Sequence, residues 1–572
     1  IRRQPRSTLF PYTTLFRSDA EARDFLCGPA FLAWQFMTNI QSHAGPIPKS
    51  WIDERIQLGR RILTRQRELG MTPILHGFSG YVPKIFQDKY PNARIQQQRS
   101  WCGFEGVYQL DPLDPLFEEF GSLFLKTQIE LFGTSHLFAA DPFHEGSPPK
   151  NNPLYLRQVG KRIYSLMKKM DSKAKWVMQA WSLRASIVWA VPRNDLLICD
   201  LNSSRWKSTF KFWGYPFVAG ILHNFGGRIN LHGDLQKLSL NPFTKMVKTV
   251  KNNRGMGLFM EGITQNPVYY DLVFDLIWRD DAVDIIQWLR EYFLRRYGSG
   301  GTQMDKIAQL LLQTAYRPGT DDVENSSIIC ARPALDVKKS GPNSGLLIPY
   351  DPHDLELLWQ LLLANASSFS GSPGYRFDVV DIGRQVLSNF AQRYYQNIKK
   401  AWEDRDLTTF NHNASFFIAL LSDVDNLLFT RNEYRFSTWV HDARAKGKNA
   451  DEQLLFEYNA KMLLTLWGPE DSPLIFDYAW REWADLIQSF YIPRWQQFFD
   501  FLRENLKTVT EYSERGLKQV HGREEWRANH FYSKLADWET EWVKQPLNLK
   551  DRVAEDEITL ATFLLNKYRP HF

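Results

Sequence analysis

The segment HLFAADPFHE, residues 136–145, decides the fold class of this chain. It is an apolar run too short for a helix, and it is followed by acidic residues, which is typical of a buried strand that ends at a loop. Five further segments have the same form: MTPILHGFSG from Met71, WVMQAW from Trp176, LLICDL from Leu196, PFVAGIL from Pro216 and GLFMEG from Gly257. Helix-like charged segments, such as residues 50–70, separate them. Alternation of strands and helices predicts a parallel sheet.

Two architectures have such a sheet. A doubly wound sheet that binds a nucleotide would carry a glycine-rich phosphate fingerprint, but the glycines at 298–300 have the wrong spacing and follow no predicted strand. A (β/α)8 TIM barrel fits better. We therefore expect residues 19–282 to form a partial TIM-barrel catalytic domain, an incomplete barrel of which six βα units are visible and the first two are missing.

From about residue 283 onward the pattern becomes purely helical. Two apolar stripes have helical spacing, Leu355, Leu358, Trp359 and Leu362 on one segment and Val379, Ile382, Val386 and Phe390 on the next. Proline-bearing breaks near residues 350 and 370 separate the segments. These stripes indicate core faces of an α-helical C-terminal domain over residues 283–572.

Composition excludes several classes of protein. The chain has 572 residues, 44% of them hydrophobic and 23% charged, as in ordinary globular proteins. No apolar run reaches 18 residues, so we expect no membrane span. A net charge of +6 without a dense Lys/Arg block argues against nucleic acid as a partner. The 4 cysteines are scattered, so we expect no metal site, disulfide framework or cofactor.

The first 18 residues fit nothing that follows them. Residues 9–18, LFPYTTLFRS, are the translation of the end of a common short-read sequencing adapter, and residues 1–8 continue that reading frame except at Gln4. The alternative, a basic targeting peptide, lacks the apolar run that a secretory signal needs. We expect residues 1–18 to be an adapter-derived artefact and the chain to be an N-terminally truncated fragment.

Four carboxylates lie at or just after predicted strands: Asp141, Glu145, Asp200 and Glu261. In a TIM barrel the carboxyl ends of the strands converge on one pocket. A pair of carboxylates there suits glycoside hydrolysis, in which one group protonates the leaving oxygen and the other attacks the sugar or activates water. Strand-end carboxylates also serve as helix caps or ion-pair partners, so the pattern alone leaves both interpretations open.

Six motifs, in order, resemble the alpha-N-acetylglucosaminidases of glycoside hydrolase family 89. They are FLAWQFMTNIQSHAGPIPKSW, MTPILHGFSGYVPKIF, ADPFHEGSPP, LHNFGGRINLHG, GLFMEGITQNPVYYDL and LTLWGPEDSPLIFDYAWREW. The resemblance implies a retaining exo-acting hydrolase that releases terminal alpha-linked N-acetylglucosamine from glycans. It also implies that Glu145 is the acid/base and Glu261 the nucleophile.

These implied roles make chemical demands on the two glutamates. Glu145 must carry a proton for the leaving oxygen and later accept one from water, so its pKa must be raised. Glu261 must stay ionised to form the glycosyl-enzyme ester. Retention further requires the two carboxyl groups to lie about 5 to 5.5 Å apart.

The resemblance also implies a set of sugar-binding residues. They are Trp34, Met37, Trp101, Trp181, Leu201, Leu222 and Phe225, together with Trp467, Ile475 and Tyr478 from the last motif, which suggest that the helical domain closes over the pocket. Each of these positions could equally be a core contact. His223 and Asn224 are interpreted as hydrogen-bonding residues that orient a loop.

His144, directly before Glu145, departs from the family pattern. Some members, including the animal enzymes, have Asn there, which both donates to and accepts from the 2-substituent of the sugar. A neutral His offers one donor and one acceptor in another geometry. We expect His144 to bind substrate, although it could instead tune the pKa of Glu145.

Three interpretations follow. The first is an alpha-N-acetylglucosaminidase, the second a retaining glycosidase of the same architecture with another terminal sugar, and the third a carbohydrate-binding protein without catalysis. The partner in each is a glycan. An incomplete barrel exposes sheet edges, so we expect the truncated chain to be poorly active or insoluble. We expect the protein to be a bacterial enzyme that is exported to the periplasm or the outside of the cell. The sequence does not indicate the oligomeric state.

Overall fold

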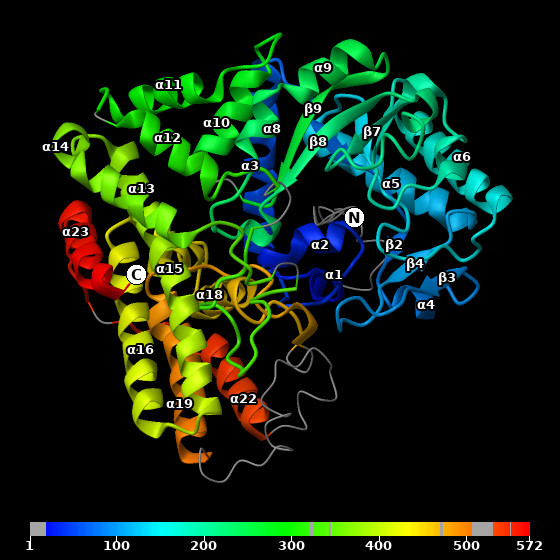
Figure 1. The fold of residues 1–572 in the computed structure, drawn as a ribbon. Coiled ribbons are helices and arrows are strands. Elements are labelled where there is room, and N and C mark those ends of the chain that lie inside the picture. Colours follow the sequence, from blue (N-terminus) through cyan, green and yellow to red (C-terminus); the bar gives the residue numbers. More distant parts are fainter. Residues whose placement is uncertain are drawn as a thin grey trace. The chain divides into compact units, whose positions relative to one another are not determined.

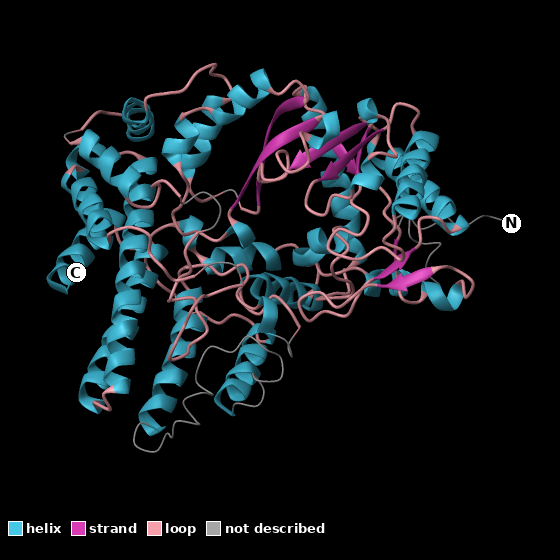
Figure 2. Cartoon of the chain, turned by 45° about the vertical axis from the view of Figure 1, so that its right-hand side comes forward, coloured by secondary structure: helices cyan, strands magenta, loops and turns pink. Residues whose placement is uncertain are grey.

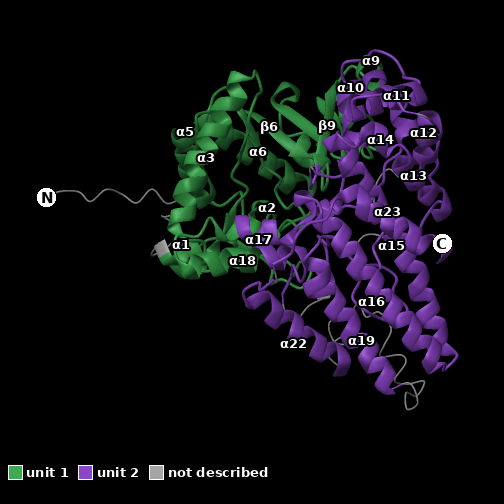
Figure 3. Ribbon diagram, turned by 90° about the vertical axis from the view of Figure 1, so that its left-hand side faces the viewer, with its two compact units in different colours: residues 1–221, 246–259, 443–459 green, residues 222–245, 260–442, 460–572 purple. Residues whose placement is uncertain are grey.

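The computed structural model describes residues 19–262, 264–301, 303–319, 324–342, 345–469, 473–505, 530–549 and 551–571. The expected adapter segment, residues 1–18, lies outside these ranges. The chain divides into two compact units (Figure 3). Unit 1 comprises residues 1–221, 246–259 and 443–459, and unit 2 comprises residues 222–245, 260–442 and 460–572.

A six-stranded sheet runs through unit 1, and all six predicted strands are found in it (Figure 2). The strands are β1 (Ile74–His76), β5 (Leu137–Ala139), β6 (Lys175–Gln179), β7 (Leu196–Asp200), β8 (Phe217–His223) and β9 (Asn253–Met260). Their order in the sheet follows the chain, β1-β5-β6-β7-β8-β9. The pairs from β1 to β8 are parallel, so the predicted parallel sheet is confirmed.

Helices alternate with these strands. The long ones are α3 (Lys49–Glu68), α5 (Pro115–Phe132) and α6 (Pro153–Met170) (Figure 1). Asn152 caps α6 by accepting a hydrogen bond from the Tyr155 N–H, and Pro153 fills the first turn, where no N–H is needed. The apolar face of α6 is buried along its whole length, as the helical spacing of its apolar residues requires.

A second, three-stranded antiparallel sheet in unit 1 was not predicted. It has the order β2-β4-β3, with β2 (Tyr81–Val82), β3 (Ile95–Gln97) and β4 (Tyr108–Leu110). These strands lie in segments that mix polar and apolar residues, so no apolar run marks them, unlike the equally short β1 and β5. The connection between β3 and β4 carries Trp101, which forms an isolated bridge with Phe104.

Shorter helices complete both units. They are α1 (Asp19–Phe25), α2 (Leu32–Phe36), α4 (Phe86–Lys89), α7 (Ala185–Val188), α8 (Leu235–Ser239), α9 (Pro242–Thr249), α10 (Pro267–Leu276), α14 (Ala366–Phe369) and α17 (Phe436–Arg444). No helix within the described ranges is both long and apolar enough to cross a bilayer.

Unit 2 is built mainly from long helices. They are α11 (Ile285–Tyr297), α12 (Met304–Gln313), α13 (Pro352–Ala364), α15 (Pro373–Glu403), α16 (Leu407–Phe429), α19 (Ile492–Asn505), α22 (His530–Lys544) and α23 (Glu557–Tyr568), while α18 (Ala450–Leu464) is shared with unit 1. Helices α15 and α16 lie side by side (Figure 1). Both predicted stripes, on α13 and α15, are buried, which confirms that they are core faces.

The expectation of a purely helical pattern is wrong for one segment. Between α12 and α13, the described residues of 314–351 form turns and bends and contain no helix. Pro, Gly, Ser and Asn recur along this segment and break regular structure. It nevertheless packs inside unit 2, where Ile328, Ile329 and Cys330 have no exposed surface.

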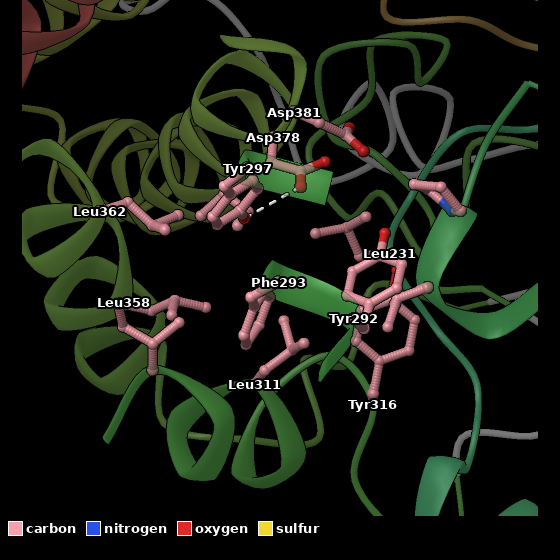
Figure 4. A pocket seen from close by; sticks show the side chains of 14 residues that line it. Leu231, Tyr292, Phe293, Tyr297, Leu311, Tyr316, Leu358, Leu362, Asp378 and Asp381 are labelled. Carbon is pink, nitrogen blue, oxygen red and sulfur yellow. Dashed lines mark hydrogen bonds between the residues drawn. The ribbon is translucent and has the colours of Figure 1, made fainter. Parts of the chain in front are cut away.

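A small internal cavity of about 30 Å³ lies in the helical part of unit 2 (Figure 4). Side chains of α11, α12, α13 and α15 line it, and most are apolar or aromatic. At its edge the Tyr297 hydroxyl donates to Asp378 at 3.0 Å, and Arg296 donates to the same carboxylate at 2.7 and 2.8 Å. This volume accommodates a few water molecules at most and no sugar, so the cavity is a packing feature of the core.

Arg384 on α15 forms the centre of a buried ion network in unit 2. Its side chain has no exposed surface, and it donates to Glu482 at 2.6 Å and to Asp381 at 3.0 Å. It also donates to the Asn230 side chain at 2.8 Å and to the Ile229 carbonyl at 2.9 Å. These two hydrogen bonds connect the long helix α15 to the segment that follows β8.

We predict that Arg384→Leu destabilises the protein strongly. Removing the guanidinium leaves Asp381 and Glu482 buried without their cation, which costs about 3–5 kcal/mol in free energy of unfolding. Arg290→Leu is the control, because its ion pair with Asp305 is half exposed, and its loss should cost about 0–1 kcal/mol. Urea denaturation of both variants measures the difference, and equal stabilities would contradict the prediction.

Candidate active site

Glu145, in unit 1, accepts three hydrogen bonds from side-chain N–H groups. Asn39 Nδ2 donates to Oε2 at 2.7 Å, and the Trp101 indole N–H donates to the same oxygen. The Trp181 indole N–H donates to Oε1 at 3.0 Å. The residue itself is exposed, so its carboxyl group is fixed in orientation while it remains open to solvent.

The fold explains why these donors converge. Glu145 follows β5 and Trp181 follows β6, and neighbouring parallel strands end at the same edge of the sheet. Trp101 comes from the connection between β3 and β4, and Asn39 comes from the loop after α2. Sequence reasoning missed Asn39, although it lies inside the first family motif, because only the structure shows that this amide is buried and reaches Glu145.

The other predicted site residues of the first and third motifs differ in burial. Trp34 on α2 and Met37 just after it are half-buried. His144 is buried, and this burial lowers its pKa, although the charge of Glu145 opposes the effect. The His144 imidazole is therefore neutral at neutral pH and offers one donor and one acceptor.

A pocket of about 210 Å³ opens in unit 1 at the ends of β6 and β7. Two predicted sugar-binding residues, Trp181 and Leu201, line it together with Ala180, Asp200, Asn202, Ser204 and Arg205. Because Trp181 also donates to Glu145, this pocket adjoins the carboxyl group. A flat indole beside polar side chains is the kind of surface that accommodates a sugar ring.

Asp141 and Asp200 hold backbone groups of the loops at the strand ends. Asp141 accepts the Gln179 N–H at 2.7 Å, and burial raises its pKa to about 7. Asp200 accepts the N–H groups of Arg205 and Trp206 at 3.2 and 3.0 Å, and burial raises its pKa as well. Both residues stabilise the loops at the strand ends, which matches the structural interpretation of such carboxylates.

Glu261, in unit 2, comes directly after β9. Its Oε2 accepts the Gly226 N–H at 2.6 Å and the Tyr478 hydroxyl at 2.8 Å. Although the residue is exposed, the protein atoms crowded around its carboxyl group displace water and raise its pKa. The two hydrogen bonds and the charges of Arg228 and Arg481 act in the opposite direction.

The turn that presents the Gly226 N–H requires glycine. Gly226 and Gly227 have φ angles of 64° and 70°, which side chains rarely adopt. A Cβ atom on Gly226 would lie 2.6 Å from the Tyr478 carbonyl oxygen. Arg481 Nη2 closes the arrangement by donating to the Gly226 carbonyl at 2.7 Å.

The remaining predicted residues of unit 2 fall into two groups. Leu222, Phe225 and Tyr478 are half-buried. Trp467 and Ile475 are buried, and the Trp467 ring packs edge-on against Tyr478 at a centroid distance of 5.7 Å. Trp467 therefore supports the tyrosine that holds Glu261.

His223 and Asn224 orient the loop after β8, as predicted. His223 Nδ1 lies 2.8 Å from the Tyr270 hydroxyl, and Asn224 Nδ2 donates to the same oxygen at 2.5 Å. Both residues are fully buried.

Within the described part of the chain, no group of three His, Cys, Asp or Glu residues is arranged to hold a metal ion. The four cysteines are free.

Comparison with known proteins gives matches over both halves of the chain. Residues 10–280 match the alpha-N-acetylglucosaminidase TIM-barrel domain, and residues 288–567 match the C-terminal domain of the same family. The human alpha-N-acetylglucosaminidase is 33% identical over 517 residues, which cover 86% of this chain and 68% of the human protein.

Solved structures of a family 89 glycoside hydrolase from Clostridium perfringens are also similar. Its complex with PUGNAc has a TM-score of 0.88 and 27% identity, covering 98% of this chain and 63% of the Clostridium chain. A variant of that enzyme in which two glutamates are replaced by glutamine, in complex with its substrate GlcNAc-alpha-1,4-galactose, has the same TM-score of 0.88 at 27% identity, covering 97% and 63% of the two chains. This chain thus spans less than two thirds of the Clostridium chain.

We predict that Gly226→Ala destabilises the fold, because the new Cβ atom would clash with the Tyr478 carbonyl and the left-handed conformation strains any other residue. The expected loss is about 1–3 kcal/mol in free energy of unfolding. The control is Gly371→Ala, since a Cβ atom there meets nothing within 4 Å. Urea denaturation compares the two, and a Gly226→Ala protein as stable as the control would refute the proposed strain.

Proposed function

The chain belongs to the alpha-N-acetylglucosaminidase family, and on that premise we propose that it is a retaining exo-acting glycoside hydrolase that releases terminal alpha-linked N-acetylglucosamine from glycans. The observation that carries the proposal is the contrast between two glutamates at strand ends. Glu145 is exposed and oriented by three N–H donors, whereas Glu261 is crowded by protein atoms and held on one oxygen. Carboxyl groups in different environments suit different steps of a double displacement.

The relatives support this assignment. The human relative is an alpha-N-acetylglucosaminidase. The Clostridium enzyme binds GlcNAc-alpha-1,4-galactose as its substrate in a form that lacks two glutamates. If two carboxyl groups perform the hydrolysis, replacing both by amides leaves a bound substrate intact.

Glu261 is suited to the role of nucleophile. Both of its hydrogen-bond donors, the Gly226 N–H and the Tyr478 hydroxyl, bind Oε2, which leaves Oε1 for attack on the sugar. Desolvation raises the pKa of Glu261, and hydrogen bonds to the ionised form and two nearby arginines partly offset that rise. A desolvated but ionised carboxylate is a reactive nucleophile.

Glu145 is suited to the role of acid and base. Its carboxyl group must give up a proton and take one back in each turnover, so access to water is an advantage. Asn39, Trp101 and Trp181 restrict its orientation from both oxygens.

The proposed reaction has two steps. In the first, Glu261 Oε1 forms a bond to C1 of the sugar while the glycosidic bond breaks, and the proton of Glu145 goes to the departing oxygen. In the second, water attacks C1, its proton goes to Glu145, and Glu261 leaves as a carboxylate. The sugar is released with its original alpha configuration.

Substitution of either glutamate tests the proposal. We expect Glu145→Gln to lower kcat/KM for an aryl alpha-N-acetylglucosaminide about 10²- to 10⁴-fold and Glu261→Gln to lower it by about 10⁴-fold or more. Glu291→Gln on α11 is a matched control at an exposed glutamate that accepts a hydrogen bond from its helix neighbour Gln287, and it should retain full activity. Activity of either active-site variant close to that of the wild type would refute the assigned roles.

The configuration of the first product tests retention separately. Proton NMR during hydrolysis should show alpha-N-acetylglucosamine first, with the beta anomer appearing only through later equilibration. Early release of the beta anomer would mean that Glu261 activates water instead of attacking the sugar.

A second candidate is a glycosidase of the same kind with another terminal sugar, and it is favoured by His144. This buried neutral imidazole stands next to Glu145 where some family members have Asn. Rates on the aryl alpha-glycosides of N-acetylglucosamine, N-acetylgalactosamine and glucose distinguish the two candidates. Binding without any hydrolysis would instead favour a carbohydrate-binding role.

The raised pKa of Glu261 has a consequence for pH dependence. The nucleophile must be ionised, so activity falls when pH drops through its pKa, and a raised pKa places this fall at a higher pH than for an ordinary glutamate. Tyr478→Phe removes a donor that favours the ionised form, so we expect the acid limb of kcat/KM to move up by about one pH unit. Tyr164→Phe is the control, since that hydroxyl bonds Asp195 instead, and an unmoved limb in Tyr478→Phe would contradict the prediction.

A further inference from the structure

Unit 2 contains an ion pair, Arg228 with Glu324, that neither assigned role uses. Arg228 Nε lies 2.6 Å from Glu324 Oε1, and neither side chain has any exposed surface. Desolvation of both charges offsets most of their attraction, so a buried ion pair adds little net stability to a fold. The position of this pair beside the residues that hold Glu261 indicates a role there.

Arg228 contacts both structures that hold Glu261. It closes the turn that presents the Gly226 N–H, because its own Nε also donates to the Phe225 carbonyl at 2.8 Å. Its guanidinium lies over the Tyr478 ring, 5.9 Å from the centroid. The positive charge of Arg228 also favours the ionised form of Glu261.

Glu324 is placed to fix Arg228 and to balance its charge. It belongs to the irregular segment between α12 and α13, where nothing in the sequence pattern marks it. Burial raises its pKa to about 7 against the opposing charge of Arg228. The titratable and charged groups that face this ion pair and Glu261 are His232, Tyr270, Tyr478 and Arg481, together with the two partners themselves.

His232 does not act as a second cation for Glu324. Its Nε2 lies 3.9 Å from Glu324 Oε2, and its ring stacks on His223 at a centroid distance of 3.9 Å. Burial lowers the pKa of His232 to about 4, so the ring is neutral over most of the pH range of interest. Burial also lowers the pKa of Arg481 to about 10, so this arginine, unlike His232, stays charged over that pH range.

We propose that Arg228 and Glu324 are positioning residues for the nucleophile: Glu324 fixes Arg228, and Arg228 holds the turn at Gly226 and the ring of Tyr478 against Glu261. This inference rests on the proposed function, in which Glu261 attacks the sugar.

The test compares Arg228→Gln, Arg228→Lys, Glu324→Gln and the double variant, using the pH dependence of kcat/KM for 4-nitrophenyl alpha-N-acetylglucosaminide. Arg228→Gln should move the acid limb up by about one pH unit, because a charge that favours ionised Glu261 is lost. Arg228→Lys keeps the charge and should leave the limb in place. Glu324→Gln should also move the limb up, by less than Arg228→Gln does, because Arg228 keeps its charge but is no longer held by its partner.

A merely structural pair would behave differently. Its variants would lose activity or stability without moving the limb, and that result in soluble Arg228→Gln would overturn the proposal. A limb that stays in place or moves to lower pH in Glu324→Gln would show that Glu324 does not position Arg228. If a single variant fails to fold, the double variant removes both buried charges with side chains that can still hydrogen-bond, and it should show the upward shift of Arg228→Gln.

A second readout is independent of turnover. The ¹³C carboxyl resonance of Glu261 in glutamate-labelled protein, identified by its loss in Glu261→Gln, titrates with the pKa of this group. Soluble wild-type protein that binds the aryl glycoside without hydrolysing it would refute the proposed function, whereas the titration would still decide the positioning role. An upward shift in Arg228→Gln supports the role, and an unchanged titration contradicts it.

Discussion

The hydrogen bond from the Gly226 N–H to Glu261 is the contact on which the arrangement around Glu261 depends. At 2.6 Å it fixes the carboxylate from a turn that only glycine can form without strain. The turn is itself held from several sides. Arg481 donates to the Gly226 carbonyl, Arg228 to the Phe225 carbonyl, and Arg384 on α15 to the Ile229 carbonyl.

These supports share one physical feature, which is that buried guanidinium groups satisfy backbone carbonyls. A turn after a strand has carbonyl groups without partners in the sheet, and a buried carbonyl must be paired. Arginine supplies several donors in a rigid fork, so one side chain can pair two or three acceptors. The helical part of unit 2 thereby stabilises the loop that carries the Gly226 N–H. These buried charges are unfavourable in themselves, but they fix the position of that N–H group.

Glu145 and Glu261 show how environment separates two identical side chains. Glu145 has three N–H donors shared between its oxygens and is open to water. Glu261 has two donors on a single oxygen and is crowded by protein atoms, with arginine charges nearby. The first arrangement suits proton exchange and the second suits nucleophilic attack, so the surroundings of each carboxyl group fit the proposed roles.

Much of the framework could be predicted from the sequence because it depends on local patterns. The six strands lie in short apolar runs and the helical stripes have helical spacing, and a short window reveals both. The strands β2, β3 and β4 lie in no such run, and Glu324 lies in a segment without a regular pattern. Asn39 contacts Glu145 across 106 positions, and the Gly226 donor is a backbone group that no residue type announces. Such contacts depend on tertiary structure, which no local pattern encodes.

The central claim is that Glu261, and not Glu145, forms the bond to the sugar. The most direct measurement is to trap the intermediate with a 5-fluoro derivative of N-acetylglucosaminyl fluoride and to locate the label by proteolysis and mass spectrometry. The label is expected on the peptide that contains Glu261, and Tyr478→Phe should be labelled at the same residue more slowly. A label on Glu145, or hydrolysis without any covalent intermediate, would contradict the claim.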